Sequence, residues 1–364
     1  MNPDFQRLMG EATRLTRAGD LRAATAAIQA ALGTGSMPFG AAPVGTPFGV
    51  IDVEAREVPE RQAPERGLDD GTPHADQRRV PPEGRFIAGS HADKAAGRRD
   101  YKLFIPSGAG ERPLPLVVML HGCTQHPDDF AAGTGMNEAA QAQGFLVLYP
   151  AQSQRASPQR CWNWFKHHHQ QRGRGEAALL AGMTREVMAR HQVDPRRVYV
   201  AGLSAGGAMA AILGQAYPDI YAAVGVHSGL AAGAASDLPS ALMAMKGGAA
   251  AAPAVGSGMP TIVFHGDADA TVHQSNGEQV VAASAGGAAT VEVIRQQANG
   301  ARAYTRRVHR AADGRVLAEH WLVHGAPHAW SGGSAKGSYT DSQGPDASAE
   351  MLRFFFEHPH RRAH

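Results

Sequence analysis

A serine between two glycines ends an apolar stretch of the chain. Residues 198–207 read VYVAGLSAGG, so Ser204 is the centre of a G-x-S-x-G pattern. In a nucleophile elbow such a serine sits on a strained strand-to-helix turn, where only glycine neighbours avoid collision with nearby backbone. With 43 glycines in the chain, the pattern also fits an ordinary glycine-rich turn. The apolar strand before it and the helix of small residues after it favour Ser204 as a nucleophile.

A serine nucleophile needs a base, and the base needs an orienting acid. Residues 261–272 read TIVFHGDADATV, and Asp269 fits the H-G-x-x-D-x-x-V spacing better than its competitor Asp267, which is then a turn residue. Residues 320–330 read HWLVHGAPHAW. There we favour His328 over His324, because His328 lies on the loop that must reach back to the serine. The order Ser, Asp, His is the order found in α/β-hydrolases.

An ester or amide carbonyl attacked by serine also needs two backbone N–H donors for its oxyanion. Ala205, directly after the nucleophile, supplies one of them. The loop HGCTQ at 121–125 follows a predicted strand and supplies the other, with Cys123 as the donor and Gly122 allowing close approach. The alternative is that this loop is a plain tight turn.

The chain has two cysteines, Cys123 and Cys161, which excludes a disulfide-rich scaffold and a four-thiolate zinc site. They are either two buried thiols or a bridge that closes a loop of roughly 40 residues, worth about 3–4 kcal/mol in the chain-entropy model. Three consecutive histidines at 167–169 are interpreted as part of a solvated loop. The less favoured alternative is that they bind a metal ion. Adjacent side chains cannot all converge on one ion, so we expect no metal.

Strand-like apolar runs alternate with helical stretches from residue 84 onward, which predicts a mostly parallel α/β sheet flanked by helices. Strands are expected at 101–105, 116–120, 145–149, 197–203, 222–226, 261–264 and 320–323. Helices are expected at 137–143, 175–191, 205–217 and 347–356, and an Ala/Gly-rich surface loop at 247–258. Each predicted site residue follows the end of a strand in this scheme.

Two further segments precede this catalytic domain, which we place at 84–364. Residues 1–32 carry apolar side chains at helical spacing on both sides of a break, which predicts an αα-hairpin. Its apolar stripe must be covered by the main domain, by a second copy or by another surface. Residues 33–83 lack periodicity and hold much of the Gly and Pro excess, so they are read as a linker.

A net charge of +2 gives no reason to expect a nucleic-acid partner. No apolar run approaches the ~20 residues of a membrane span. Residues 1–32 also lack the apolar core of a secretory signal, which favours the cytoplasm unless another export route is used.

Five motifs occur in order: HGCTQ, CWNWF, GLSAGGAM, HGDADATVH and PHAWSGG. Together they resemble the polyhydroxybutyrate (PHB) depolymerase family of esterases over roughly residues 100–356. The resemblance implies an α/β-hydrolase fold, no cofactor and an extracellular location. The residue roles it implies are a triad of Ser204, Asp269 and His328, an oxyanion hole at Cys123 and Ala205, a Cys123–Cys161 disulfide, and substrate contacts from Trp162 and Trp330.

The activity implied by the resemblance is serine-dependent hydrolysis of poly- or oligo(3-hydroxybutyrate)-type esters, or of other short-chain esters. No separate polymer-binding domain is recognised, which favours soluble oligomers or amorphous granules over crystalline polymer. A feruloyl or other aromatic carboxylesterase is the alternative within enzymes. The alternative from another class is a non-catalytic protein that binds a polymer granule through its helical hairpin.

Overall fold

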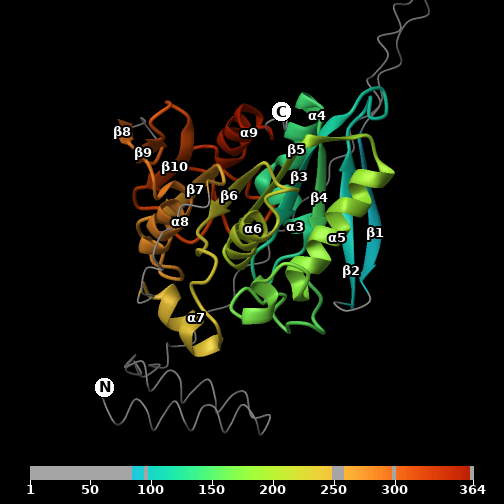
Figure 1. Ribbon diagram of the computed structural model, residues 1–364, viewed down its shortest axis with the longest axis horizontal. Helices are drawn as coiled ribbons and strands as arrows, with labels where there is room; N and C mark the ends of the chain where they lie inside the picture. The colour runs from blue at the N-terminus through green and yellow to red at the C-terminus, as the bar shows by residue number, and fades with distance from the viewer. Residues whose placement is uncertain (1–83, 94–96, 248–257, 297–300, 361–364) are drawn as a thin grey trace, which may run out of the picture. The chain divides into compact units, whose positions relative to one another are not determined.

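A ten-stranded sheet is the centre of the computed structural model, which describes residues 84–93, 97–247, 258–296 and 301–360. The strand order is β1-β2-β4-β3-β5-β6-β7-β10-β9-β8, and Figure 1 shows it from β8 on the left to β1 on the right. The six strands from β4 to β10 in this order pair in parallel, whereas β1, β2, β9 and β8 pair antiparallel at the two edges. The predicted mostly parallel sheet is therefore confirmed.

The strands of the large sheet are β1 (Arg85–Asp93), β2 (Gly97–Ile105), β3 (Leu114–Leu120), β4 (Leu146–Pro150), β5 (Val193–Leu203), β6 (Ala223–His227), β7 (Thr261–Gly266), β8 (Thr290–Gln296), β9 (Tyr304–Arg310) and β10 (Val316–Val323). Two short strands, β11 (Trp330–Ser331) and β12 (Thr340–Asp341), pair with each other. The central strands β3 and β4 are buried along their whole length, as expected for strands covered on both faces.

Helices cover both faces of the sheet. They are α3 (Pro127–Thr134), α4 (Met136–Gln143), α5 (Gly175–Arg190), α6 (Ala205–Ala216), α7 (Leu238–Met245), α8 (Ser275–Ala285) and α9 (Ala347–Glu357), with a 3₁₀ turn η1 at His167–Gln170. One apolar core joins the sheet to α5, α6 and α8, which face the viewer in Figure 1, and a second core joins it to α3, α4 and α9.

The helix α6 shows why small residues follow the predicted nucleophile. Its sequence AGGAMAAILGQA is buried at nine of its positions, against β5 and β6. A Cβ added at Gly214 would lie 2.3 Å from the Val224 side chain, so the helix packs closer to the sheet than a larger residue would allow. This close packing fixes the start of the helix, where Ser204 is the N-cap residue.

The elements that the sequence did not predict include the edge strands β1, β8 and β9 and the helices α3, α7 and α8. Strand β8 is exposed at nearly every position, so its side chains give no alternating apolar pattern. Strand β1 is likewise half exposed, and α7 is a short helix of eight residues. The predicted hairpin at 1–32, the linker at 33–83 and most of the loop at 247–258 lie outside the described residues.

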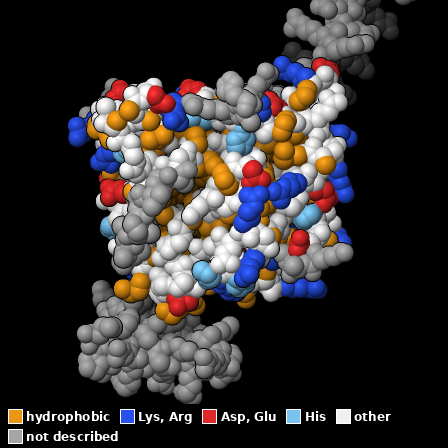
Figure 2. All heavy atoms as spheres, in the orientation of Figure 1, with side chains coloured by type: hydrophobic (Ala, Val, Ile, Leu, Met, Phe, Trp, Pro, Cys, Tyr) orange, Lys and Arg blue, Asp and Glu red, His pale blue; other side chains and the backbone are white. Residues whose placement is uncertain are grey.

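The surface in Figure 2 carries acidic and basic side chains side by side, with exposed hydrophobic side chains over α7 at the lower left. Leu238 and Met243 of α7 are each 53% exposed. None of the helices in the described part of the chain has the length and apolar run needed to cross a bilayer. The described residues also contain no group of three or more side chains placed to hold a metal ion.

Candidate active site

Ser204 lies on a strained turn between β5 and α6. Its φ is +57° and its ψ −119°, a backbone conformation that non-glycine residues rarely adopt. The turn passes very close to β3: a Cβ at Gly206 would lie 2.0 Å from the Leu120 carbonyl oxygen. A Cβ at Gly202 would lie 2.4 Å from the Gly206 carbonyl carbon. Both glycines of the G-x-S-x-G pattern are thus required by contact, as the sequence predicts.

The two acid–histidine alternatives in the sequence form two separate pairs. The Nδ1–H of His328 donates to Asp269 Oδ2 at 2.7 Å, and their side chains are 13% and 0% exposed. The Nδ1–H of His324 donates to Asp267 Oδ2 at 2.8 Å, with side chains that are 41% and 30% exposed. Asp267 also accepts from the Gly325 N–H at 2.6 Å, the turn role expected of it.

The Asp269 carboxylate accepts hydrogen bonds on both of its oxygens. Its Oδ1 accepts from the N–H groups of Thr271 and Val272, each at 2.9 Å. Burial on its own raises the pKa of this carboxyl, but the hydrogen bond from His328 and those from the turn outweigh burial, so the pKa lies below its usual value. Asp269 is therefore ionised at neutral pH and fixes His328 with Nδ1 protonated and Nε2 unprotonated.

Ser204 and His328 both line a cavity of about 370 Å³. Cys123 and Ala205, the two predicted oxyanion donors, line the same cavity. The remaining wall is mostly apolar and includes Trp164, Phe165, Tyr339 and several α7 side chains. The structure thus brings the predicted nucleophile, base and oxyanion donors together at one cavity.

Two tryptophans lie elsewhere than expected, and the structure corrects the predicted substrate contacts. Trp162 is fully buried, and its Nε1–H donates to the His121 carbonyl at 3.1 Å. Trp330 is 1% exposed; its Nε1–H donates to Ser348 Oγ at 3.0 Å, and its ring stacks on His227. Neither lines the cavity. Each indole N–H finds its acceptor inside the protein, which places these rings behind the cavity wall.

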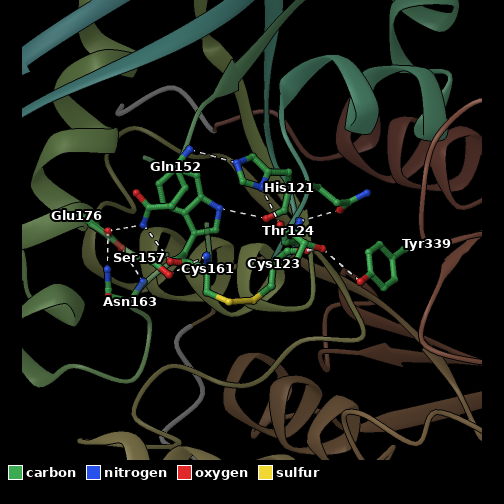
Figure 3. The surroundings of a disulfide bond; sticks show 12 residues. His121, Cys123, Thr124, Gln152, Ser157, Cys161, Asn163, Glu176 and Tyr339 are labelled. Carbon is green, nitrogen blue, oxygen red and sulfur yellow. Dashed lines mark hydrogen bonds between the residues drawn. A yellow bond between two sulfur atoms is a disulfide. The ribbon is translucent and has the colours of Figure 1, made fainter. Parts of the chain in front are cut away.

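The disulfide implied by the resemblance is present and joins Cys123 to Cys161. Figure 3 shows it at the centre, with Glu176 and Asn163 on one side and Tyr339 on the other. The loop that carries Cys123 is also fixed by hydrogen bonds: the Thr124 N–H donates to the Gln159 carbonyl at 2.6 Å. These links tie the predicted oxyanion loop to the segment that contains Cys161.

His121 stabilises the start of the predicted oxyanion loop through hydrogen bonds at both ring nitrogens. Its Nδ1–H donates to the Gly122 carbonyl at 2.7 Å, and its Nε2 accepts from the Gln152 N–H at 3.1 Å. Burial lowers the pKa of His121 to about 4, so the ring is neutral and keeps this donor–acceptor pattern at neutral pH.

Glu176 is a buried anchor of the segment beside the cavity, and the sequence did not reveal it. Its buried carboxylate accepts from the Asn163 N–H at 2.7 Å, from Asn163 Nδ2 at 2.9 Å and from Gln152 Nε2 at 2.5 Å. Arg99 approaches it at 3.5 Å. The available signal was an acidic residue among the apolar positions at the start of the predicted helix at 175–191.

The histidine run at 167–169 forms part of η1 and makes local contacts. His169 Nδ1 accepts the Glu176 N–H at 3.0 Å, and His167 Nε2 lies 2.7 Å from Gln171 Nε2. His167 and His168 are exposed, as the solvated-loop interpretation expects, whereas the His169 side chain is only 14% exposed.

Residues 99–303, more than half of the 364, match the family described as Esterase PHB depolymerase. The chain belongs to this family. It is 31% identical to poly(3-hydroxyalkanoate) depolymerase C of Paucimonas lemoignei over 239 residues, which are 62% of this chain and 56% of that protein. It is also 31% identical to feruloyl esterase B of Thermothelomyces thermophilus over 140 residues, 38% of this chain and 47% of that protein.

This member of the Esterase PHB depolymerase family spans about half the length of those two curated relatives. A solved structure of acetyl xylan esterase from Aspergillus awamori superimposes with a TM-score of 0.58 at 19% identity. The superposition covers 74% of this chain and 99% of that one. It confirms the predicted α/β-hydrolase fold.

Proposed function

We propose that this protein is a serine-dependent carboxylic ester hydrolase. The observation that carries the proposal is the buried Asp269–His328 hydrogen bond beside a cavity that Ser204 also lines. The strained turn at Ser204 and the membership in the Esterase PHB depolymerase family support it. No metal or organic cofactor is needed for this chemistry.

In the proposed reaction, His328 Nε2 takes the proton from Ser204 Oγ as the oxygen attacks the ester carbonyl carbon. The backbone N–H groups of Ala205 and Cys123 hold the oxyanion. Collapse breaks the ester C–O bond, and the leaving alkoxide takes the proton from His328. A water then attacks the acyl-enzyme with His328 again as base, which releases the carboxylic acid and restores Ser204.

Asp269 acts through His328. Its carboxylate accepts the Nδ1–H, so the Nε2 lone pair points away from the acid and remains available to Ser204. Once His328 gains a second proton, the adjacent negative charge stabilises the imidazolium. The buried position of Asp269 makes this interaction stronger than it would be in water.

For the substrate, we propose an oligo- or poly(3-hydroxybutyrate)-type ester or another short-chain ester. The largely apolar wall of the cavity supports an acyl group with little charge. An aromatic acyl ester such as a feruloyl ester is the second candidate, because Trp164 and Phe165 line the cavity with their rings edge to face at 5.8 Å.

The decisive experiment compares hydrolysis of 3-hydroxybutyrate oligomers, feruloyl esters and p-nitrophenyl esters by wild type and by Ser204→Ala. We expect the variant to lose at least about 10³-fold in kcat while it keeps its fold. Equal background rates for both proteins would refute the proposed hydrolase function and favour the alternative of a non-catalytic granule-binding protein. The ratio of kcat/KM between the hydroxybutyrate and feruloyl substrates decides between the two substrate classes.

A matched pair of variants tests the acid. Asp269→Asn should lower kcat by about 10³–10⁴-fold, because the amide cannot hold His328 in the required tautomer. Asp267→Asn should leave kcat within about threefold, because its partner His324 is separate from the cavity. The reverse pattern would assign the acid to Asp267.

A further inference from the structure

Two buried histidines lie behind the proposed acid, on neighbouring strands. In the parallel pairing of β7 with β10, His320 is opposite Val263 and His265 is opposite Leu322. Side chains two residues apart on a strand share a face, so His265 and His320 lie on the same face of the sheet. Helix α8 covers that face and contacts both strands. Their exposed fractions are 0% and 2%.

The hydrogen bonds of each ring fix which nitrogen carries its proton. His265 Nε2 lies 2.8 Å from the Val272 carbonyl, which can only accept, so Nε2 carries the proton. Arg307 Nη1 lies 3.5 Å from His320 Nδ1 and can only donate, so His320 carries its proton on Nε2. Burial lowers the pKa of both rings, that of His320 to about 3, so both are neutral.

The other nitrogen of each ring has no hydrogen-bond partner among the described residues. These two atoms, His265 Nδ1 and His320 Nε2, converge on Gly277 of α8. A Cβ at Gly277 would lie 2.9 Å from the first and 3.2 Å from the second. One atom is a lone-pair acceptor and the other is an N–H donor, so they are complementary.

We propose that a single buried water binds at Gly277, accepts the Nε2–H of His320 and donates to His265 Nδ1, and that His265 is thereby a positioning residue for Asp269. This inference rests on the proposed triad. Buried waters typically serve polar groups that lack protein partners, and two to four such groups suffice to hold one. His320 also lines a surface pocket with Arg307 and His309, which offers the water a route in.

The proposed water stabilises the His265 tautomer that the Val272 carbonyl selects. With Nδ1 accepting from the water, the proton stays on Nε2, where it binds the Val272 carbonyl and lies 3.6 Å from Asp269 Oδ2. Val272 in turn donates its N–H to Asp269 Oδ1. The opposite tautomer would point a lone pair at the Val272 carbonyl and at the Asp269 carboxylate. That repulsion would move the turn that aims Asp269 at His328.

Gly277 lies in the first turn of α8, and a Cβ there would press on His265 Nδ1 at 2.9 Å as well as occupy the place of the proposed water. Gly277→Ala places a methyl group where we place the water. We expect kcat for a soluble ester to fall about tenfold or more with KM nearly unchanged, since the substrate cavity is not touched. Gly287→Ala is the matched control, because a Cβ there meets no atom within 4 Å.

Substitutions at His320 separate hydrogen bonding from packing. His320→Gln retains an N–H donor near the position of Nε2 and should keep most of the wild-type kcat. His320→Leu has no donor and should lower kcat to the level of Gly277→Ala. Equal kcat in His320→Gln and His320→Leu, or a fall in Gly287→Ala as large as in Gly277→Ala, would overturn the role of the water.

Two measurements do not depend on activity. A high-resolution crystal structure should place a water within hydrogen-bond distance of both nitrogens. Long-range ¹H–¹⁵N NMR spectra of wild type should show His265 protonated at Nε2, and the Nδ1 resonance should shift in Gly277→Ala because that nitrogen loses the water's hydrogen bond. A dry site, or an unchanged Nδ1 resonance in the variant, would refute the inference even in a protein that hydrolyses esters. A wild type without esterase activity but with both signals would instead refute only the proposed function.

Discussion

Glu176 is a residue whose loss should weaken the wall behind the candidate active site. Its carboxylate accepts three hydrogen bonds, two of them from Asn163, and it is 2% exposed. Asn163 follows Trp162 and Cys161, and Cys161 is bridged to Cys123, the proposed oxyanion residue. Glu176→Gln therefore disturbs the segment on which the proposed oxyanion loop depends, without changing the size of the side chain.

The magnitude follows from what glutamine can still accept. Its single oxygen can keep the bonds to Asn163 Nδ2 and Gln152, but its NH₂ group then faces the Asn163 N–H as a second donor. A buried N–H left without an acceptor costs about 1–3 kcal/mol of stability. The remaining hydrogen bonds also weaken, because their acceptor is no longer charged. Arg99, whose side chain is 11% exposed, also loses its counter-ion. We expect a loss of about 3 kcal/mol in the free energy of unfolding.

Urea denaturation followed by tryptophan fluorescence measures this loss, and thermal unfolding should show a Tm lower by roughly 6–10 °C. Glu186→Gln is the matched control on the same helix, because the Glu186 side chain is 24% exposed, pairs with Arg190 and hydrogen-bonds His91 Nδ1, a bond that the glutamine oxygen can keep. It should cost less than about 1 kcal/mol. Equal losses in the two variants would refute the assigned role of Glu176, as would a Glu176→Gln protein with wild-type stability.

Four further variants have outcomes that follow from the structure. Cys161→Ala breaks the bridge and should lower the free energy of unfolding by about 3–4 kcal/mol in urea denaturation, so a change below 1 kcal/mol would argue against the loop-closure account. Gly206→Ala puts a Cβ 2.0 Å from a carbonyl oxygen of β3 and should yield little soluble protein; normal yield with full activity would contradict the observed turn. Glu319→Gln removes the buried partner of two arginines and should cost about 3–5 kcal/mol in the same denaturation assay. Glu350→Gln, at a partly exposed pair, should cost under about 1 kcal/mol, and similar losses would contradict the difference in burial.

The parallel core of the sheet could be predicted because its strands are buried on both faces and read as continuous apolar runs. The strand expected at 116–120 is observed as Leu114–Leu120, and the helix expected at 205–217 as Ala205–Ala216. The antiparallel edges could not be predicted in the same way. Strand β8 owes its place to backbone pairing with β9, and its side chains are mostly exposed, so apolar periodicity carries no signal there.

The candidate site likewise has two kinds of feature. Some follow from close backbone contacts and can be predicted from the sequence, and others depend on which side chains meet in the folded protein. Gly202 and Gly206 are needed because two backbones touch, and that requirement is visible in the spacing of the glycines. The sequence CWNWF, by contrast, offers two tryptophans with no local difference between them. Trp162 turns inward because the His121 carbonyl accepts its N–H, whereas Trp164 lines the cavity. That acceptor is 41 residues away along the chain, so only the folded arrangement can decide which ring faces the cavity.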